Sequence, residues 1–507
     1  MDISLSILFM SLIILLLSLY KFLISSNKTR IPPGPIPLPI IGNLFDFDDQ
    51  PVHHSLTRLA KVYGPIMSIK FGLTTTIVVS SPMAACEILQ KKDAYFSARE
   101  IPDSFHAFDH YKVSMLWLPS TSPLWKHLRA ICATYLFSAR SLESSRQIRV
   151  KKVREIIEHF HQNAGSKVNI HQIMFSGMLN VISNVLFSQD VVNINSELPQ
   201  EFKECIAGFI NEMIKPNISD FFPFIRVLDL QGRRRTLAGY LERLYGYFDQ
   251  LINARLKNRS RVSGILNGDF LDYLLELYFE SKISRHEIHA LLTDLFVAGT
   301  DTSTTTVEWA MAELLHDPVS MAKAQTEVQE TFGLKALEEP ETVKLPYLQA
   351  VVKEVLRLHP PGPLLVPHRA MEAGLNLCGC GYTVPRGARV MINVWAIGRD
   401  PGVWDQPDIF RPERFLGKDM DFQGRDFEFI PFGSGRRICP GLPLVRRVVP
   451  FLLALMLQEF AWRLPNGMEP NDVDLTEKFA SALELAVPLH AVPISVVQRG
   501  LQGKKYI

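Results

Sequence analysis

A cysteine with the surroundings of a metal ligand lies near the C-terminal end of the chain, in residues 432–441, which read FGSGRRICPG. A metal bound by one thiolate needs that sulfur deprotonated, unobstructed and supplied with hydrogen bonds. The glycines permit turns and a close backbone approach that side chains would block. Residues after Cys439 can start a helix whose first amides favour a negative sulfur, and Arg437 suits an anionic group on a cofactor. The segment therefore predicts that Cys439 binds the metal of a cofactor.

A second stretch of interest lies in the middle of a long expected helix. Ser284 followed by Glu287 fits a capping box, and the helical pattern runs to Asp317, where proline follows. About 32 residues at about 1.5 Å each give about 50 Å, enough to cross the whole protein. In its apolar middle, residues 298–306 read AGTDTSTTT, and glycine and β-branched hydroxyl residues lower helix propensity there. A central helix weakened in this way indicates a functional site.

The N-terminal segment is apolar enough to span a membrane. Residues 3–24 carry no charge before Lys21, and about 20 apolar residues cross a bilayer core of roughly 30 Å. A cleaved signal peptide is the alternative, but no positive charge precedes the run and no small-residue cleavage site follows it. Lys21, Lys28 and Arg30 follow the span, so the positive-inside rule places the body on the cytosolic side. We expect residues 1–24 to form a transmembrane anchor.

A proline-rich strap and a mainly helical body are expected to follow the anchor. Residues 31–43 read IPPGPIPLPIIGN, and their prolines stiffen the chain and forbid helix. Helical patterns predominate from there to about residue 340, whereas β-branched residues alternate with polar ones in residues 66–80 and 381–398. The sequence therefore predicts a strap over residues 25–43 and a mainly α body with a small β region over residues 44–507.

Composition excludes several classes of protein. The 507 residues carry a net charge of +2, with 47% hydrophobic and 21% charged residues, which is typical of a globular protein and not of a nucleic-acid-binding or disordered tail. In a reducing cytosol, six cysteines in this length do not indicate a disulfide framework, and without a CxxC pair they do not indicate structural zinc. The five others are expected to be buried apolar side chains or surface thiols: Cys86, Cys132, Cys205, Cys378 and Cys380.

The cysteine loop resembles a motif of a known protein family. Phe432, Gly435, Arg437, Cys439 and Gly441 follow the spacing F-x-x-G-x-R-x-C-x-G, which resembles the haem-binding signature of the cytochrome P450 family. The resemblance implies haem as the cofactor, with Cys439 as the axial thiolate on its iron. It also implies one large, mainly α catalytic domain with a small β region, although length alone favours two or three domains.

Further motifs extend the resemblance over essentially the whole chain. KEVLR contains Glu354 and Arg357, and FRPERF contains Arg414. The resemblance implies that these three form a buried ionic triad. The alternative is a solvated helix pair worth a few tenths of a kcal/mol.

The same resemblance implies a set of contacts to the haem propionates. Trp125 and Arg129 of WKHLR lie one helical turn apart and resemble the family's propionate-binding pair. His368 of VPHRA is similar to another propionate contact, with a surface histidine as the alternative. Together with Arg437, these residues are the expected cofactor-binding set.

The weakened stretch of the long helix resembles the family's oxygen-binding groove. Gly299 would make room for dioxygen, Thr302 would hydrogen-bond the oxygen during its activation, and Asp301 would relay protons. A back-bond to the carbonyl four residues earlier is the alternative for Thr302, and both can hold. A haem-thiolate sensor would need no proton relay, and an isomerase would need neither oxygen nor a reductase. The acid and alcohol pair therefore favours a monooxygenase in which Asp301 and Thr302 are catalytic.

Partners and location follow from the same resemblance. No flavin or nicotinamide motif is evident, so electrons are expected from the membrane-bound NADPH-dependent flavoprotein reductase. The basic residues 146–154 could help to dock it, although a solvated helix face is favoured for most of them. Residues 221–235 mix apolar and basic side chains as an interfacial membrane contact does. The C-terminal KKYI resembles a dilysine retrieval signal, which indicates the endoplasmic reticulum membrane.

The expected substrate class comes from one branch of the family. WLPSTSPLWKHLR, WAIGRDPGVW and GRDFEFIPFGSGRRICPG resemble the plant branch that contains geraniol hydroxylases and other terpenoid oxidases. A lipophilic substrate gains about 25 cal/mol per Å² buried, whereas a zwitterion needs charged partners. The family's pocket segments fall here on apolar residues: Phe105, Phe108, Phe296, Ala298, Leu364, Leu365, Val366, Leu483 and Leu485.

Two alternatives to a terpenoid pocket remain open in the sequence. The same branch resembles enzymes that oxidise tyrosine derivatives, and Asp294 on the long helix is the nearby charge that could bind a phenolic amino acid. Packing in the core would equally explain the apolar set.

Overall fold

The computed structural model describes residues 10–15, 30–195, 200–259, 268–333, 335–377 and 379–496 of the 507 in the chain. Residues 10–15 are helical, whereas the rest of the expected anchor and the C-terminal KKYI lie outside the described residues. Within the described part, α7 (Ile170–Phe187) is the one helix long and apolar enough to cross a membrane, and 89% of it is buried inside the protein. Packing in the core therefore explains the apolarity of α7.

The described residues are mainly helical, and short strands lie towards both ends of the chain. The other α-helices are α2 (Val52–Tyr63), α3 (Pro82–Cys86), α4 (Pro123–Ile131), α5 (Ala139–Ser144), α6 (Arg146–Gln162), α8 (Glu201–Ile214), α9 (Ile218–Phe221), α10 (Arg233–Arg259), α11 (Phe270–Phe279), α12 (Arg285–His316), α13 (Pro318–Phe332), α14 (Pro346–Leu358), α15 (Val394–Ile397) and α16 (Leu442–Glu459). The strands are β1 (Ile66–Phe71), β2 (Thr74–Val79), β3 (Ala98–Arg99), β4 (Val168–Asn169), β5 (His368–Arg369), β6 (Leu375–Leu377), β7 (Tyr382–Val384), β8 (Arg389–Ile392), β9 (Phe460–Arg463), β10 (Glu477–Phe479), β11 (Leu483–Leu485) and β12 (His490–Ser495).

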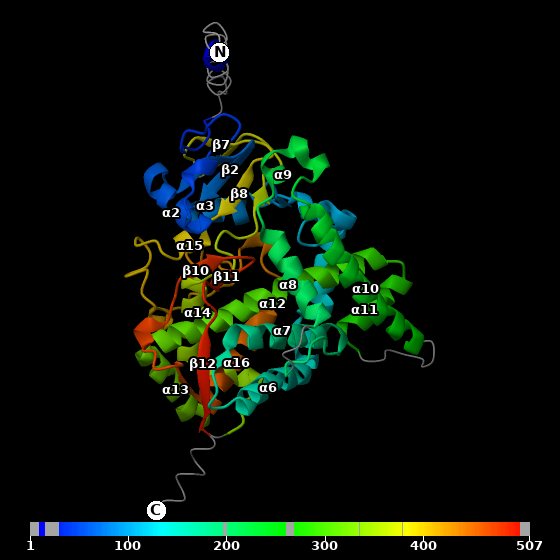
Figure 1. Cartoon of the computed structure of the whole chain (residues 1–507), viewed down its shortest axis with the longest axis vertical. Coiled ribbons are helices and arrows are strands. Elements are labelled where there is room, and N and C mark those ends of the chain that lie inside the picture. The colour runs from blue at the N-terminus through cyan, green and yellow to red at the C-terminus, as the bar shows by residue number, and fades with distance from the viewer. Residues whose placement is uncertain are drawn as a thin grey trace, which may run out of the picture.

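The main sheet has five strands in the order β1-β2-β8-β5-β3 and lies towards one end of the molecule (Figure 1). β1 and β2 form an antiparallel hairpin over the residues that the sequence predicts, and β8 runs parallel to β2. Residues 381–398 are only partly extended, because after β7 and β8 the chain turns into α15. The Asn393 side chain accepts a hydrogen bond of 3.0 Å from the Ala396 N–H and so caps that helix.

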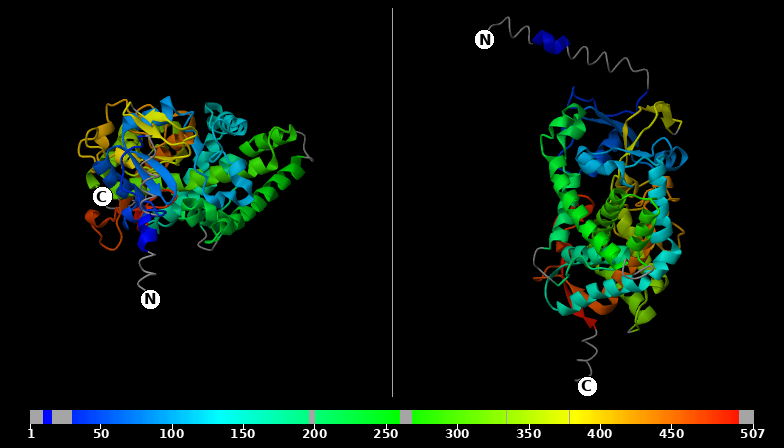
Figure 2. Two further views of the ribbon diagram at one scale, coloured as in Figure 1. Left: turned by 90° about the horizontal axis from the view of Figure 1, so that it is seen from above. Right: turned by 90° about the vertical axis from the view of Figure 1, so that its right-hand side faces the viewer.

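The helices form the larger part of the molecule, and α12 crosses it (Figure 1). Helices α10 and α11 lie on the side away from the five-stranded sheet, as the view from above also shows (Figure 2). The first half of α12 packs in one apolar cluster with α7, α8 and α10, and its last part packs in another with α14 and α16. The stretch 298–306 therefore falls between two cores.

Helix α12 begins and ends where the sequence predicts. The Ser284 side chain accepts a hydrogen bond from the Glu287 N–H, and the Glu287 carboxylate accepts one of 2.6 Å from the Ser284 N–H. Asp317 ends the helix before the proline that begins α13. The capping box fixes the register of α12 and thus the faces on which residues 298–306 lie.

Glu354 binds two buried arginines. On α14, its carboxylate accepts hydrogen bonds of 2.7 and 2.8 Å from Arg357, and one of its oxygens also accepts a bond of 2.8 Å from Arg414. Arg357 donates further to the carbonyls of Gly398 and Pro407. The triad thereby ties α14 to the chain that leads into the cysteine loop.

Replacing Glu354 with alanine should leave two buried guanidinium groups without their carboxylate. We expect the free energy of unfolding to fall by about 3–5 kcal/mol, as it does when one partner of a buried ion pair is removed. Denaturant unfolding of the haem-loaded protein measures it. Asp405→Ala, which removes an exposed partner of Arg411, is the matched control and should unfold like wild type. Equal unfolding of both variants would contradict the structural role of the triad.

Candidate haem and oxygen site

Cys439 lies between a short 3₁₀ turn, Gly435–Arg437, and the start of α16. Its N–H donates a hydrogen bond of 3.0 Å to the Phe432 carbonyl, which closes the loop. Burial raises the pKa of the Cys439 thiol, while the backbone N–H groups of Gly441 and Leu442 at the helix start and the charge of Arg129 oppose that rise. The sulfur is therefore supplied with the hydrogen bonds that a thiolate ligand needs.

A glycine at position 435 is required by a close contact. Gly435 has φ +67°, and a Cβ there would lie 1.9 Å from the carbonyl oxygen of Leu89. Any larger residue would push the loop away from the segment Glu87–Lys91. At Gly441 a Cβ would make an ordinary contact of 3.8 Å with the Cys439 sulfur. A side chain is therefore sterically excluded at Gly435, whereas the space at Gly441 would admit a Cβ atom.

The expected propionate-binding residues come together beside this loop. Arg437 donates a hydrogen bond of 2.6 Å to the Ser97 carbonyl and another to the carbonyl of Leu118, and its guanidinium lies 5.2 Å from the centre of the Trp125 ring. Arg129 donates a bond of 2.5 Å to the Ile438 carbonyl, next to Cys439. Helix α4 thus places Trp125 and Arg129 against the cysteine loop.

His368 is buried in β5 and does not lie on the surface. Its Nδ1 is 2.7 Å from the Phe96 carbonyl oxygen. Burial and the charges of Arg99 and Arg437 hold the pKa of His368 well below its usual range, so the ring is neutral. The neutral ring has one N–H group, which the Phe96 carbonyl accepts, so Nε2 carries no proton that His368 could donate to an anion.

Arg99 also lies beside the expected propionate-binding residues, although no sequence motif surrounds it. On β3, beside β5, its side chain is buried and donates to the Val366 carbonyl, while its Nε has no hydrogen-bond partner among the described residues. A single arginine in a short strand gives no sequence signal. Only the pairing of β3 with β5 brings it beside His368.

The three guanidinium groups are short of negative charge. Burial lowers the pKa of Arg99, Arg129 and Arg437, and the nearby charge of Arg437 lowers that of Arg99 further. Among the residues that the structure describes, no carboxylate forms an ion pair with any of them. Arg99 is buried, and Arg129 and Arg437 are half-buried. Because charge that is withdrawn from water without a counter-charge is costly, an anionic ligand fits this place. The two propionates of haem meet the requirement, with Cys439 as the iron ligand.

Helix α12 is open to solvent in its middle. From Ile288 to Leu315 every residue is buried except Ala298, Gly299 and Thr302. Ala298 and Thr302 are one turn apart, and the Thr302 hydroxyl donates a hydrogen bond of 2.7 Å to the Ala298 carbonyl. These residues therefore line an accessible space inside the protein, and the back-bond leaves the lone pairs of the Thr302 hydroxyl able to accept a hydrogen bond.

Gly299 has a packing reason in addition to its expected role of making room for dioxygen. A Cβ at Gly299 would lie 2.9 Å from Cδ1 of Ile182 on α7. The glycine therefore lets α12 approach α7 closely, since the missing side chain would point into that contact. We assign Gly299 a packing role.

Asp301 is buried on another face of the helix. Its carboxylate accepts a hydrogen bond from the Ser481 hydroxyl, in the turn between β10 and β11. Burial raises the pKa of Asp301, while the bond from Ser481 and the charge of His171 oppose that rise. The carboxyl is therefore able to hold a proton, but it does not share the accessible face of Ala298 and Thr302.

Some of the expected pocket residues lie near the cofactor residues. Leu365 and Val366 are half-buried, and the Val366 carbonyl accepts the bond from Arg99. A Cβ at Gly433 would lie 3.7 Å from Leu365. Leu364, one residue earlier, is buried in the apolar cluster of β1 and β2.

Other expected pocket residues are packed in the protein or lie at its surface. The Phe296 ring is fully buried against Phe202 and Phe248, so it belongs to the core of α8, α10 and α12. Phe105 is buried against Trp117, whereas Phe108 is 49% exposed. Leu483 and Leu485 are buried on β11.

Asp294 is engaged by the protein itself. The Ser114 hydroxyl lies 2.9 Å from both of its carboxylate oxygens, and the Leu116 N–H donates to it at 3.3 Å. His110 is 3.5 Å away. Asp294 therefore holds the segment before α4 against α12.

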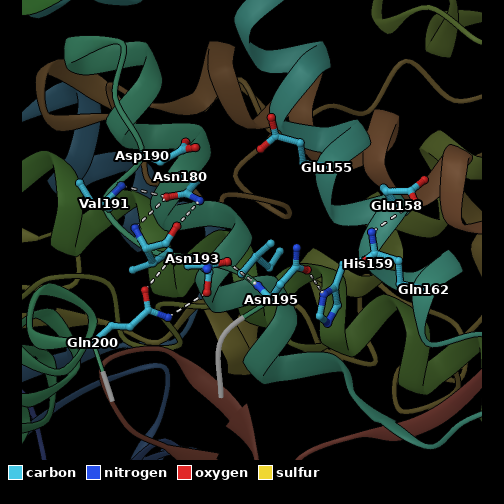
Figure 3. A pocket seen from close by; sticks show the side chains of 12 residues that line it. Glu155, Glu158, His159, Gln162, Asn180, Asp190, Val191, Asn193, Asn195 and Gln200 are labelled. Carbon is cyan, nitrogen blue, oxygen red and sulfur yellow. Dashed lines mark hydrogen bonds between the residues drawn. The ribbon is translucent and has the colours of Figure 1, made fainter. Parts of the chain in front are cut away.

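Two further polar features do not belong to this site. A hollow of about 520 Å³ between α6 and α7 is lined by Glu155, Glu158, His159 and Asp190 among others (Figure 3), which suits neither haem nor a lipophilic molecule. Its Asn180 side chain binds the backbone of the following loop. The hollow is therefore explained by the fold.

His53, His54 and Glu477 form a potential metal-binding group, with donor atoms within 4.8 Å of one another. The Glu477 carboxylate, however, also accepts hydrogen bonds of 2.9 Å from Trp395 and His359. It is occupied by these donors, so we assign the group a structural role that joins α2, α14 and β10.

The basic segment 146–154 is largely engaged within the protein. Arg149 is buried and pairs with Glu339 at 2.5 Å, and Lys152 is buried and pairs with Asp190 at 2.8 Å. These side chains stabilise the helix packing and leave few charges in the segment for a partner.

The site defines a class of protein that holds haem through a cysteine thiolate. A family model described as Cytochrome P450 matches residues 32–486. The chain belongs to the cytochrome P450 family and is therefore a haem-dependent monooxygenase. When bound, haem with a thiolate ligand supplies the iron that activates dioxygen.

Curated relatives cover nearly the full length of the chain. It is 48% identical to cytochrome P450 76M5 of Oryza sativa subsp. japonica over 93% of both chains. It is 47% identical to ent-cassadiene C11-alpha-hydroxylase 1 of the same species, over 92% of this chain and 93% of that protein. It is 45% identical to geraniol 8-hydroxylase of Catharanthus roseus, over 94% of this chain and 97% of that protein.

Cys439→Ser should abolish the reduced carbon-monoxide spectrum typical of thiolate-bound haem, because a serine hydroxyl cannot replace a soft anionic sulfur. The spectrum of the purified variant measures this. Cys86→Ser, at a half-buried thiol outside the site, is the matched control and should keep the spectrum. A wild-type spectrum from Cys439→Ser would overturn the assignment of the ligand.

Proposed function

We propose that the protein hydroxylates a lipophilic terpenoid, with electrons that pass from NADPH through a membrane-bound flavoprotein reductase. The observation that carries the proposal is the accessible stretch of Ala298, Gly299 and Thr302 within an otherwise buried helix. It offers one hydroxyl group and otherwise no polar side chain to a substrate. The relatives named for ent-cassadiene and geraniol support a terpenoid.

The residues of the chain have distinct roles in this proposal. Arg99, Arg129 and Arg437 hold the propionates and so orient the cofactor. The Thr302 hydroxyl hydrogen-bonds the oxygen during its activation, and Asp301, the preceding residue of α12, supplies protons. Leu365, Val366 and Ala298 present apolar surface to the substrate and exclude water from it.

The alternative substrate, a phenolic amino acid, has less support. Its ammonium group would need a carboxylate that is free to bind it. Asp294 is already bonded to Ser114 and to the Leu116 N–H. An isomerase is also less favoured, because it would make no use of a proton donor beside Thr302.

A spectral binding titration of the haem-loaded protein tests the substrate class. We expect geraniol or a diterpene hydrocarbon to convert the haem iron from low to high spin, because an apolar ligand displaces water from the accessible space. Tyrosine should give no conversion. Conversion by tyrosine alone would contradict the terpenoid proposal.

Two variants make the titration specific to the space beside α12. Ala298→Phe should abolish the terpenoid-induced conversion while keeping the carbon-monoxide spectrum, because the ring fills the accessible space. Phe296→Leu, two residues away in the core, should weaken stability and leave the conversion unchanged. Loss of conversion in Phe296→Leu alone would place the pocket elsewhere.

Thr302→Ala should keep haem and substrate binding but divert electrons to peroxide, because the hydroxyl assists proton delivery and is not a ligand. The product formed per NADPH should fall on the order of tenfold. Thr306→Ala is the control, since the Thr306 hydroxyl makes a similar back-bond of 2.8 Å to the Thr302 carbonyl but is buried. Unchanged coupling in Thr302→Ala would leave Thr302 with the back-bond as its only role.

We also propose that the protein sits on the endoplasmic reticulum membrane with residues 1–24 as its anchor. The strap and the segment around α9 lie towards the same end of the molecule (Figure 1), and both expose large apolar side chains. Ile36 is 91% exposed and Val227 is 88% exposed. Deleting residues 1–24 should weaken membrane association and leave the carbon-monoxide spectrum intact. Recovery only as haem-free aggregate would contradict a separate anchor.

A further inference from the structure

A cluster of titratable groups lies behind the oxygen-binding face of α12. Asp301 and Glu308 belong to α12 itself, two turns apart, while His171 lies at the start of α7 and Glu484 on β11. Helix α12 packs against both α7 and β11. The cluster therefore joins three elements that are distant in the sequence.

Hydrogen bonds hold two of the carboxylates in place. The Nδ1 of His171 is 2.7 Å from one Glu308 oxygen, and the other oxygen accepts a bond of 2.9 Å from the Leu489 N–H. Asp301 accepts the bond from Ser481. These bonds fix the positions of the Glu308 and Asp301 carboxylates within the cluster.

Glu484 lies on β11, which packs against the helix α12 that carries the other two acids. Its cross-strand partner is Lys478, whose ammonium group is 3.9 Å from the Glu484 carboxylate. The charges of Lys478 on β10 and of Asp301, Glu308 and His171 on the helices all act on Glu484. The cluster therefore contains three carboxylates for two basic groups.

This imbalance makes the cluster hold a proton near neutral pH. Burial and the charge of Asp301 raise the pKa of Glu484 to about 7. Burial alone would lower the pKa of His171, but its bond to Glu308 outweighs burial and raises it. Burial raises the pKa of Asp301 as well. Neighbouring groups with such values can exchange a proton at little cost.

The cluster also connects solvent with the interior. The side chain of His171 is 26% exposed and that of Lys478 is 62% exposed, and Glu484 between them is partly exposed. Asp301 and Glu308 are buried. Asp301 is the neighbour of Thr302 in the sequence and is bonded to Ser481 of the same hairpin that carries Glu484.

We propose that protons for oxygen activation enter through this cluster, from solvent to His171 and Glu484 and then to Asp301. The inference rests on the proposed monooxygenase turnover and adds its proton source. In that reaction one O2, two electrons from the reductase and two protons convert a C–H bond to C–OH and release one water. Each proton given up by Asp301 is replaced from Glu484, and Glu484 is reprotonated by solvent or by His171.

The test removes one proton carrier at a time. Glu484→Gln and His171→Gln keep the size and hydrogen-bonding ability of the side chains but cannot carry a proton. With the reductase and NADPH, we expect the product formed per NADPH to fall about fivefold in each, and the peroxide share to rise. Lys344→Gln, at an exposed lysine that pairs with Glu341 outside the cluster, is the control and should couple like wild type.

The pH dependence gives a readout that a structural role would not move. Protonated Glu484 donates below its pKa, so wild-type coupling should decline as pH rises through about 7, and this decline should vanish in Glu484→Gln. Wild-type coupling with an unchanged pH profile in Glu484→Gln would overturn the proposal. An equal loss in Lys344→Gln would overturn it too.

An infrared titration separates this inference from the proposed substrate. It needs neither substrate nor turnover: the wild-type protein should show a carboxyl band that titrates near neutral pH and is missing in Glu484→Gln. If no terpenoid is turned over but the band behaves in this way, the terpenoid proposal fails and the proton-holding cluster stands. The same band in both proteins would contradict the cluster.

Discussion

The architecture around the cofactor depends on one electrostatic constraint, three buried or half-buried arginines that have no carboxylate partner among the residues the structure describes. Arg99, Arg129 and Arg437 come from β3, α4 and the cysteine loop, and burial disfavours the charge on each. Such charges persist in a folded protein only when an anion joins them. Haem brings two carboxylates and an apolar ring at once. Cys439 would hold the iron, and the arginines would orient the ring through its propionates.

The expected oxygen-binding residues lie in the middle of α12, where the sequence contains glycine and hydroxyl residues of low helix propensity. The two apolar cores at the ends of α12 stabilise it, so the stretch between them can carry glycine and hydroxyl residues. On one side this stretch exposes Ala298 and Thr302, and on another it buries Asp301 among acids and a histidine. The same turn of helix thus separates an apolar substrate side from a side that can hold protons.

Local motifs in the sequence were enough to predict the cysteine loop and the bounds of α12, because each depends on residues close in the chain. The partners of Glu354 were implied by the resemblance to the cytochrome P450 family, since Arg414 lies 60 residues away. Contacts between distant segments could not be predicted. Arg99 acquires its role through strand pairing with β5, and Asp301 meets Ser481 across 180 residues. The close approach of Gly299 to Ile182 and the packing of Phe296 in the core likewise depend on distant segments. Apolar composition alone does not distinguish a pocket wall from a packed interior.

The most direct test of the charge constraint compares haem with its dimethyl ester in reconstitution of the haem-free protein. Both have the same iron and ring, but the ester lacks the two carboxylates. We predict that haem restores the reduced carbon-monoxide spectrum and raises the thermal unfolding midpoint, whereas the ester does neither to a comparable extent. Equal stabilisation by the two compounds would show that the buried arginines do not need the propionates, and it would contradict this account of the site.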